Sequence, residues 1–357
     1  MNKTVDNTVN KTRLEAIGAY LPTTVMSTAE LLGRLEKAPE FDLVKITGTT
    51  QRRVADDTAH DPEDSLTMAV AAARDCLRRS RYAPEGIDAV ISCSISRMAD
   101  GGRLQFEPSF AHRIAEEIGA HGALRFDVSN ACAGMMTGVL LLDRLIRAGT
   151  VRNGLVLSGE QITPIAFTAA REMEDSRDPQ FASMSVGDSA VALVMDRATD
   201  ERDVIHDIEL MTCSEYSHLC LGMPSDATGG MAMYTNNKEM HAEDRLSLWP
   251  AFHGDKLAAQ GRQFADEGYD FVIHHQVGTR FVDFMNATGA SRFGAPMPPS
   301  LSVVDRLANT ATTSHYLVLH QALAEGRIPG GSKVLMVPAA SGVVTGYLSA
   351  TVSSLEV

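Results

Sequence analysis

Short apolar runs alternate with amphipathic stretches along most of the chain. In residues 65–80 the apolar positions recur at the spacing of one helix face, which predicts an amphipathic helix. The runs with the length of buried strands are residues 87–95, 154–160, 189–196, 271–275 and 333–341. Short buried strands that alternate with helices are typical of layered α/β proteins, and we predict this class of fold.

Two segments with the same order of elements indicate an internal repeat. They read DVSNACAGMMTGVLLLDRLIRAGTVRNGLVLSGE (127–160) and VVDRLANTATTSHYLVLHQALAEGRIPGGSKVLMVPAA (303–340). In each, an Asn beside small residues precedes an apolar helix, a glycine and a buried strand. Gly149 and Gly326 lie 177 residues apart, and the same offset pairs Cys132 with Asn309. Two unrelated α/β units can share this order, so the repeat alone leaves that alternative open.

The repeat predicts two halves that meet near residue 200, within a charged stretch. We expect a flexible N-terminus at residues 1–12, one half at 13–200 and the other at 201–357. Residues 214–262 are rich in Met, Gly and polar residues and have no regular pattern. Long irregular segments in compact proteins are often lids or binding loops, and a plain surface insertion is the alternative.

Charge and composition exclude several classes of function. The formal net charge of −13 argues against non-specific binding to nucleic acid or to an anionic membrane surface. The five cysteines include no CxxC pair, and a chain of this length rarely needs a disulfide framework. The N-terminus has no apolar signal sequence, and no run of 18 apolar residues occurs. We expect a cytoplasmic enzyme with reduced thiols.

Cys132 is the candidate nucleophile. It lies in SNACAGMMTGVLLLDRL, where small residues surround it and an apolar helix follows directly. The aligned peptide dipoles at a helix N-terminus favour the thiolate, which is the form that attacks a thioester. A buried, inert cysteine is the alternative.

His275 and Asn309 are weaker candidates. His274 and His275 follow each other in a strand, so they point to opposite faces and only one can face a given site. Asn309 could equally be a helix N-cap. The chain has no GxSxG, GxGxxG or P-loop and no Cys/His cluster with zinc spacing, so we expect neither a metal nor a cofactor.

An ordered set of motifs resembles 3-oxoacyl-acyl-carrier-protein synthase III and its relatives, that is, the ketosynthase III family, along almost the whole chain. The motifs are IGAYLPTTV (17–25), TGTTQRRVA (47–55), FDVSNACAGM (126–135), AGTVRNGLVLSGE (148–160), VGDSAVALVM (186–195), HQVGTR (275–280), VDRLANTATTS (304–314) and GSKVLMVPAASGVVTG (331–346). This resemblance implies a thiolase fold of five layers (αβαβα) with two pseudo-symmetric halves, and a homodimer.

The resemblance also implies a reaction. Cys132 takes an acyl group from a thioester, while the backbone N–H groups of Cys132 and Gly342 form an oxyanion hole. His275 and Asn309 hold the carbonyl oxygen of a second thioester, whose enolate attacks the acyl-cysteine and yields a β-keto thioester. The substrates are phosphopantetheine thioesters, so an acyl carrier protein is the implied partner.

Some positions depart from the housekeeping enzyme of the family. Asp42 and Ile46 stand where a Trp and an Arg hold the adenine of coenzyme A, so we expect acyl donors on a carrier protein. Arg280 matches a basic position near the tunnel mouth, where it would meet the phosphate of the carrier arm; a solvated surface charge is the alternative. Gly278 stands where the family usually has an Asn, and residues 338–342 stand where it has a Gly-rich segment. We therefore do not carry the family's contacts with pantetheine over to these positions.

Glu107 replaces a Phe that crosses the dimer interface in the housekeeping enzyme. This Glu resembles that of enzymes that join two acyl chains head to head and of α-pyrone-forming ketosynthases, where it is thought to serve the partner's site as a base. Such a base is useful because an unactivated chain must lose an α-proton, whereas a malonyl group loses carbon dioxide instead. An interface ion pair or an N-cap is the alternative.

We therefore expect a condensing enzyme that joins two acyl or β-ketoacyl chains, in secondary-metabolite or fatty-acyl biosynthesis. Decarboxylative condensation with malonyl thioesters and acyl transfer to an alcohol or amine are alternatives. A catalytically inactive scaffold subunit is a further alternative, but it would have no reason to keep Cys132, His275 and Asn309 together.

Overall fold

Two mixed β-sheets form the centre of the computed structural model, which describes residues 10–37, 39–56, 58 and 62–357. The first sheet has the order β1 (Thr12–Tyr20), β9 (Ser189–Arg197), β8 (Asn153–Glu160), β4 (Ala89–Ser92) and β7 (Leu124–Asp127). The second has the order β10 (Val204–Thr212), β16 (Val344–Val352), β14 (Ser332–Val337) and β13 (Phe271–His274), and β15 (Ala339–Ala340) pairs with β16. The predicted strands thus lie within these two sheets.

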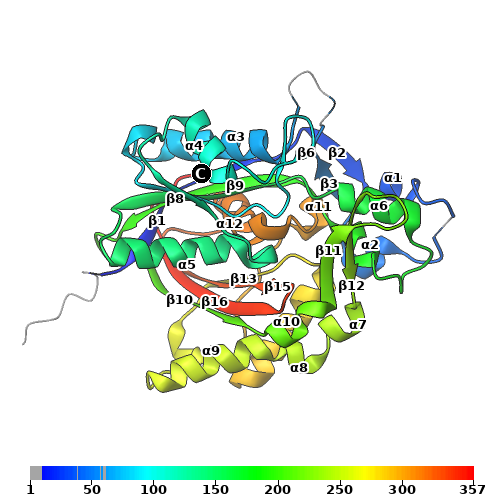
Figure 1. Ribbon diagram of the computed structural model, residues 1–357. Coiled ribbons are helices and arrows are strands. Elements are labelled where there is room, and N and C mark those ends of the chain that lie inside the picture. Colours follow the sequence, from blue (N-terminus) through cyan, green and yellow to red (C-terminus); the bar gives the residue numbers. More distant parts are fainter. Residues whose placement is uncertain (1–9, 38, 57, 59–61) are drawn as a thin grey trace, which may run out of the picture.

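Helices cover both sheets and fill the space between them, which gives the five layers expected for a thiolase fold (Figure 1). The outer helices of the first sheet are α3 (Ser65–Arg79) and α4 (Phe110–Ile118). Between the sheets lie α5 (Gly134–Arg147) and α12 (Ser314–Ala324). The outer helices of the second sheet are α9 (Leu248–Ala259) and α10 (Thr279–Phe293).

The position of α3 follows from local sequence. Asp64 caps the helix because its side chain accepts a hydrogen bond from the backbone N–H of Thr67, while the Thr67 hydroxyl oxygen accepts one from the backbone N–H of Asp64. The helix then packs against strand backbone at two glycines. A Cβ on Gly18 would lie 2.2 Å from the backbone nitrogen of Cys76, and one on Gly159 would lie 2.0 Å from the carbonyl oxygen of Ser65. A larger residue at either position would push this layer outward.

The second sheet repeats the pairings of β1, β9, β8 and β4 but has no described strand in the place of β7, and the repeat aligns differently from the offset of 177 residues. The 3₁₀ turn η2 (Ala131–Ala133) leads into α5, and η6 (Ala311–Thr313) leads into α12. Both turns begin at an alanine of positive φ, which is 44° at Ala131 and 54° at Ala311. The structural counterpart of Cys132 is therefore Thr312, and Asn309 lies three residues earlier. The offset between Gly149 and Gly326 gave the wrong register before the helices, because α12 has 11 residues and α5 has 14.

Residues 214–262 are more regular than expected. They form η4 (Ser214–Leu219), a hairpin of β11 (Cys220–Pro224) and β12 (Met231–Thr235), α7 (Asn237–Met240), α8 (Glu243–Leu246) and α9. The short spacing between these elements hid them in the sequence pattern.

The remaining elements lie around the edges of the sheets. Their bounds are β2 (Thr24–Ser27), α1 (Thr28–Leu32), α2 (Leu43–Thr47), β3 (Gln51–Val54), η1 (Pro84–Gly86), β5 (Met98–Ala99), β6 (Arg103–Leu104), α6 (Pro164–Glu172), η3 (Phe181–Ser185), η5 (Phe264–Glu267) and α11 (Val304–Leu307).

The segment expected to be flexible, residues 1–12, falls mostly outside the described residues, and its last residue belongs to a strand. Residues 1–9 lie outside the described part of the chain, but Thr12 already belongs to β1 and is fully buried, where its hydroxyl donates to Asp143 at 2.7 Å. Among the described helices, none combines the length and the apolar character that crossing a membrane requires.

Candidate active site

Cys132, His275 and Asn309 line one cavity of about 110 Å³, which we call the inner cavity. The three come from distant parts of the sequence: Cys132 from the turn before α5, His275 from the residue after β13, and Asn309 from the loop after α11. Apolar side chains form much of the remaining wall, among them Met233, Met240, Trp249, Phe281 and Met285. The fold thus brings the three candidate catalytic residues together.

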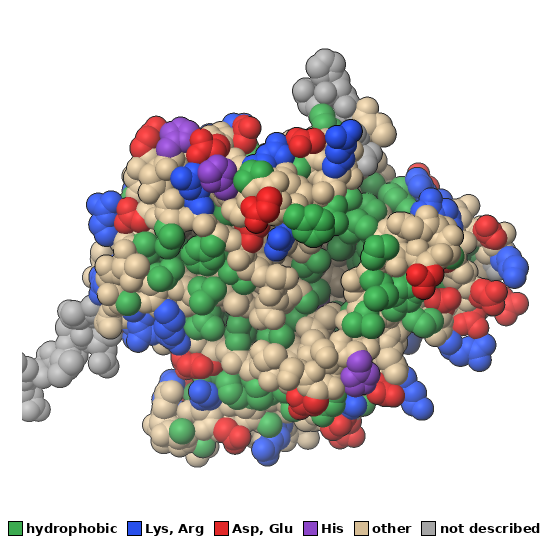
Figure 2. Space-filling model, in the orientation of Figure 1, with side chains coloured by type: hydrophobic (Ala, Val, Ile, Leu, Met, Phe, Trp, Pro, Cys, Tyr) green, Lys and Arg blue, Asp and Glu red, His purple; other side chains and the backbone are tan. Residues whose placement is uncertain are grey.

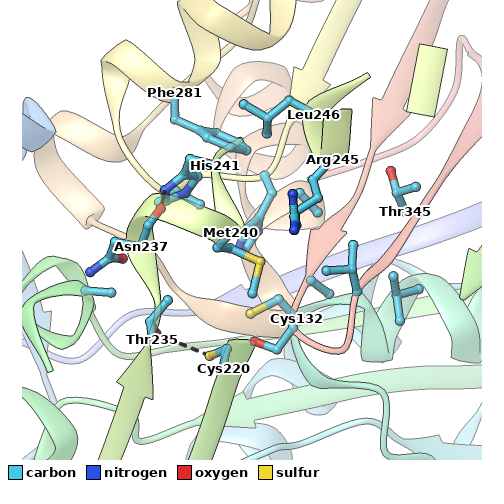
Figure 3. Close-up of a pocket in the computed structure, with 18 of the residues that line it drawn as sticks. Cys132, Cys220, Thr235, Asn237, Met240, His241, Arg245, Leu246, Phe281 and Thr345 are labelled. Carbon is cyan, nitrogen blue, oxygen red and sulfur yellow. Dashed lines mark hydrogen bonds between the residues drawn. The ribbon is translucent and has the colours of Figure 1, made fainter. Parts of the chain in front are cut away.

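Cys132 sits in η2, one turn ahead of α5, and is partly accessible from the inner cavity (Figure 3). Burial raises the pKa of its thiol to about 12, with smaller contributions from the nearby Cys220 and Glu160. The sequence pattern favoured a thiolate at a helix N-terminus. In the structure burial instead favours the neutral thiol at pH 7, because desolvation penalises the charged thiolate.

His275 and His274 point to different surroundings. His274 is buried outside the inner cavity, with its Nε2 2.9 Å from the Asn286 side-chain oxygen. His275 faces the inner cavity, and its ring stacks on His315 with 5.6 Å between centroids. The Nδ1 of His275 is enclosed without a hydrogen-bond partner among the described residues, so Nε2 is the nitrogen available to a bound thioester. Burial lowers the pKa of His275 to about 3, so the ring is neutral at pH 7.

Asn309 is held rigidly by both its backbone and its side chain. Its N–H donates to the Ser185 carbonyl at 2.9 Å, and its own carbonyl accepts from Gly187 at 3.0 Å. Its side-chain oxygen accepts from the backbone N–H of Ala311 at 3.0 Å and from the Ser314 hydroxyl at 3.4 Å. Because the oxygen is occupied, the amide NH₂ is the group that can donate to a ligand in the inner cavity. Asn309 therefore does not act as a helix N-cap alone.

Gly342, the second expected donor of the oxyanion hole, stands between Ser341 and Val343, which both line the inner cavity. The adjacent strand β15 packs against the turn that carries Cys132. The pairing of the N–H groups of Cys132 and Gly342 on a bound oxyanion stays a prediction.

A second cavity of about 440 Å³, which we call the outer cavity, adjoins the inner one. The two share six residues in their walls: Ala182, Asn237, His241, Leu246, Val277 and Phe281. Arg280 lines the outer cavity, is exposed and does not line the inner cavity with Cys132. Its contact with a carrier arm stays a prediction.

The residues that depart from the housekeeping pattern have local explanations. Ile46 lines the outer cavity and is 37% exposed, whereas Asp42 caps α2 by accepting a hydrogen bond from Lys45 N–H. Gly278 is required because a Cβ there would lie 2.9 Å from the Thr47 carbonyl oxygen. An Asn at this position would force α2 and α10 apart.

Glu107 does not line the inner cavity of its own chain. It follows β6 on an exposed loop, next to Phe106, which is 72% exposed. A catalytic role for Glu107 would therefore require another copy of the chain.

The sequence pattern did not single out several residues of the inner cavity, and the two with reactive or charged side chains, Cys220 and Arg245, come from 214–262. Cys220 faces Cys132 across the cavity, and Arg245 points into it from α8 (Figure 3). The sequence feature that could have pointed to Arg245 is its position in the Met-rich segment that was predicted to be a possible lid or binding loop. No group of His, Cys, Asp or Glu among the described residues is arranged to hold a metal ion.

The lowered pKa values of the buried histidines determine how the stability of the protein depends on pH. Burial lowers the pKa of His274 and of His315 to about 4 and that of His275 to about 3, whereas an unfolded His protonates near pH 6.5. The unfolded state therefore binds more protons between pH 6.5 and 4, so stability falls as the pH falls through this range. Asp188, whose pKa burial raises to about 6, opposes part of this trend.

We expect the free energy of unfolding to be lower at pH 5 than at pH 7 by more than about 2 kcal/mol. Urea titrations followed by the fluorescence of the single, buried Trp249 measure it. His315→Gln should flatten the pH dependence, and replacement of the exposed His112 by Asn should not. Equal slopes in all three proteins would show that the buried histidines are not responsible.

Comparison with known proteins agrees with this geometry. Residues 126–213 match the family described as 3-oxoacyl-[acyl-carrier-protein] synthase III, and residues 259–351 match its C-terminal part. A β-ketoacyl-[acyl-carrier-protein] synthase III of Acidiphilium cryptum is 29% identical over 344 residues, covering 95% of this chain and 98% of that protein. A second one, from Deinococcus deserti, is 26% identical over 344 residues, covering 92% and 87%.

Solved structures share the fold. The 3-oxoacyl-[acyl-carrier-protein] synthase III of Aquifex aeolicus superposes with a TM-score of 0.76 at 24% identity, covering 95% of this chain and 99% of that one. OleA of Xanthomonas campestris, in a structure with lauric acid and lauroyl-CoA, superposes with a TM-score of 0.78 at 19% identity, covering 96% and 99%.

Proposed function

The chain belongs to the 3-oxoacyl-acyl-carrier-protein synthase III family, and from this premise we propose that it joins two thioesters by a Claisen condensation. In this proposal Cys132 carries the first acyl group, and the α-carbon of the second thioester attacks it. The observation that carries the proposal is the meeting of Cys132, His275 and Asn309 in the inner cavity.

Acyl transfer to Cys132 comes first. The thiol loses its proton as its sulfur attacks the thioester carbonyl, a new C–S bond forms, and the bond to the carrier thiol breaks. The carrier leaves as a free thiol. The neutral His275 is a suitable temporary proton acceptor, because its ring is not protonated at pH 7.

Condensation follows when a second thioester enters through the outer cavity. The Asn309 NH₂ and the His275 Nε2 can donate to its carbonyl oxygen and so stabilise the enolate. The enolate forms when the α-carbon loses a proton, or carbon dioxide in the case of a malonyl group. Its carbon attacks the acyl carbonyl, the C–S bond to Cys132 breaks, the sulfur takes up a proton, and a β-keto thioester remains on the carrier. Two preorganised donors around one oxygen favour this reaction over transfer to an alcohol or amine, which would need no enolate.

Mass spectrometry of the products tests the proposal. The protein is incubated with an acyl thioester and a second thioester on phosphopantetheine carriers, and we expect a β-keto thioester together with one free thiol for each condensation. The same assay with a malonyl thioester as the second substrate tests the alternative, decarboxylative condensation. Formation of only esters, amides or free acids would reject the condensing function.

The acyl donors, we propose, arrive on an acyl carrier protein that docks at Arg280. The relatives named above carry that partner in their names, and Arg280 has no ion pair within the described residues. We expect Arg280→Glu to raise KM for carrier-bound substrate about tenfold or more, because one phosphate contact becomes a repulsion, with a smaller change in kcat. Arg292→Glu, at the other end of α10, is the matched control. Equal effects of both variants would point to the overall charge instead.

The working unit, we propose, is a homodimer formed through the face that carries β7, α5 and β11. What supports it is a set of large apolar side chains left exposed there: Ile95, Leu104, Phe106, Leu124, Leu141, Leu221 and Met223. Figure 2 shows hydrophobic side chains spread over the middle of this face, with charged side chains mostly around its rim. An exposed apolar surface of this kind usually marks an interface. In such a dimer Glu107 would reach the partner and serve as a base there.

We expect Glu107→Gln to slow the condensation of two unactivated chains about 10²–10³-fold, because an α-proton must be removed. Acyl loading and malonyl condensation should stay within about twofold of the wild type, because carbon dioxide loss needs no such base. Steady-state rates with both second substrates, at unchanged oligomeric mass, measure the difference. Equal losses in the two reactions would assign Glu107 a structural role.

A further inference from the structure

Arg245 is an unexpected cation in the inner cavity. Its guanidinium points into the space that Cys132 also faces (Figure 3). Its side chain is only 15% exposed. Arg245 lines the inner cavity but not the outer one, so it is distinct from Arg280 at the entrance. A group that interacts with Arg245 must therefore be part of the acyl group and not the phosphate of the carrier arm.

The neighbours of Arg245 leave its charge only partly compensated. One terminal nitrogen pairs with Asp244 at 2.7 Å, but that carboxylate is 68% exposed and stands outside the inner cavity. The guanidinium also stacks on Tyr216, with 4.6 Å to the ring centre. The Nε is buried without a hydrogen-bond partner among the described residues. A buried donor left unpaired costs free energy that a ligand can restore.

The rest of the inner cavity supplies no counter-charge. Within the described part of the chain its lining contains no Asp or Glu, and Arg245 is its one Lys or Arg. Burial lowers the pKa of His241 and that of His275, so neither adds a charge at pH 7. An alkyl chain placed there would leave the guanidinium desolvated and unpaired, whereas a carboxylate would complete a bidentate pair.

The size of the inner cavity limits the acyl group. Its volume of about 110 Å³ is smaller than the roughly 150 Å³ of an apolar cavity that accepts benzene. A short group fits this space better than a long alkyl tail.

We propose that Arg245 selects, for transfer to Cys132, a short acyl group that ends in a carboxylate, the half-thioester of a small dicarboxylic acid. This inference rests on the proposed acyl transfer and names its substrate class. The sulfur of Cys132 bonds to the thioester carbonyl, the bond to the carrier sulfur breaks, and the carrier leaves as its thiol with the proton from Cys132. The distal carboxylate is unchanged and stays paired with Arg245.

Matched acyl groups test this inference. The rate of acylation of Cys132 is followed by intact-protein mass with the phosphopantetheine thioesters of succinate and of its monoamide, which has the same shape without the charge. We expect the wild type to take the succinyl group about 10–100-fold faster than the amide, the range of a charge-assisted hydrogen bond. Arg245→Met should abolish this preference, Arg245→Lys should keep part of it, and Arg292→Met should keep all of it.

Equal rates for acid and amide in the wild type, or an unchanged preference in Arg245→Met, would overturn the inference. If Arg245→Met does not fold, the ratio of the wild-type acylation rates with the succinyl thioester and its monoamide tests the inference by itself. Loading of alkyl or amide groups without the succinyl group would reject the inference and leave the proposed function intact. Failure of every thioester to acylate Cys132 would instead reject the proposed function.

Discussion

Cys132→Ala should give no covalent acyl-enzyme and a condensation rate at least about 10⁴-fold below that of the wild type. Two cysteines, Cys132 and Cys220, line the described inner cavity with His275 and Asn309, and Cys132 is the one in the turn that leads into α5. The thiol is neutral at rest, so the wild-type rate of acylation should rise with pH above neutrality as the thiolate fraction grows.

Intact-protein mass with a panel of acyl-carrier thioesters measures this loss. Cys213→Ser is the matched control, since Cys213 is buried and lies outside the inner cavity. An acyl adduct of normal size in Cys132→Ala would mean that another residue carries the acyl group. Cys220 would then be the first residue to examine, because it shares the inner cavity.

His275→Ala should separate the two half-reactions. We expect condensation to fall about 10³-fold, because the enolate loses one of its two donors in a desolvated site. Acylation of Cys132 should fall less, because its oxyanion hole uses backbone N–H groups and that step loses only the proton acceptor that His275 supplies. Rapid-quench measurements of acyl-enzyme formation and of its consumption by a second thioester give both rates.

His274→Gln is the control for this variant, since His274 does not line the inner cavity; it contacts Asn286 and packs behind Trp249, which does line it. Its ratio of acylation to condensation should match the wild type even if the protein is less stable. A parallel loss of both rates in His275→Ala would contradict the assignment of His275 to the enolate.

The fold follows from the sequence to a large extent, because its strands are short buried runs and α3 shows a clear apolar face. The order of motifs then identified the thiolase architecture. The internal repeat was recognised, but its register was wrong, since nothing in the pattern shows that α12 lacks three residues of α5. Thr312, the true counterpart of Cys132, donates a hydrogen bond to the buried Glu160 at 2.8 Å and ties the two halves together.

The candidate site was predictable only in part. Cys132, His275 and Asn309 lie in motifs, so the sequence could suggest them. The state of the thiol could not be predicted, because desolvation depends on residues far away in the chain. Arg245 lies in a four-residue helix with no motif, and only the packing of α8 against the second sheet turns its side chain inward. Glu107 stays a prediction that depends on a partner subunit.

The most direct test of the central claim follows the fate of an isolated acyl-enzyme. Wild-type protein acylated on Cys132 with a ¹³C-labelled carbonyl is freed of carrier and mixed with a second, unlabelled thioester. We expect the acyl mass to disappear as a β-keto thioester forms, with the ¹³C carbonyl bonded to the α-carbon of the second substrate. Release of the label as free acid, or its transfer to an oxygen or nitrogen atom, would contradict the claim that this site makes a carbon–carbon bond.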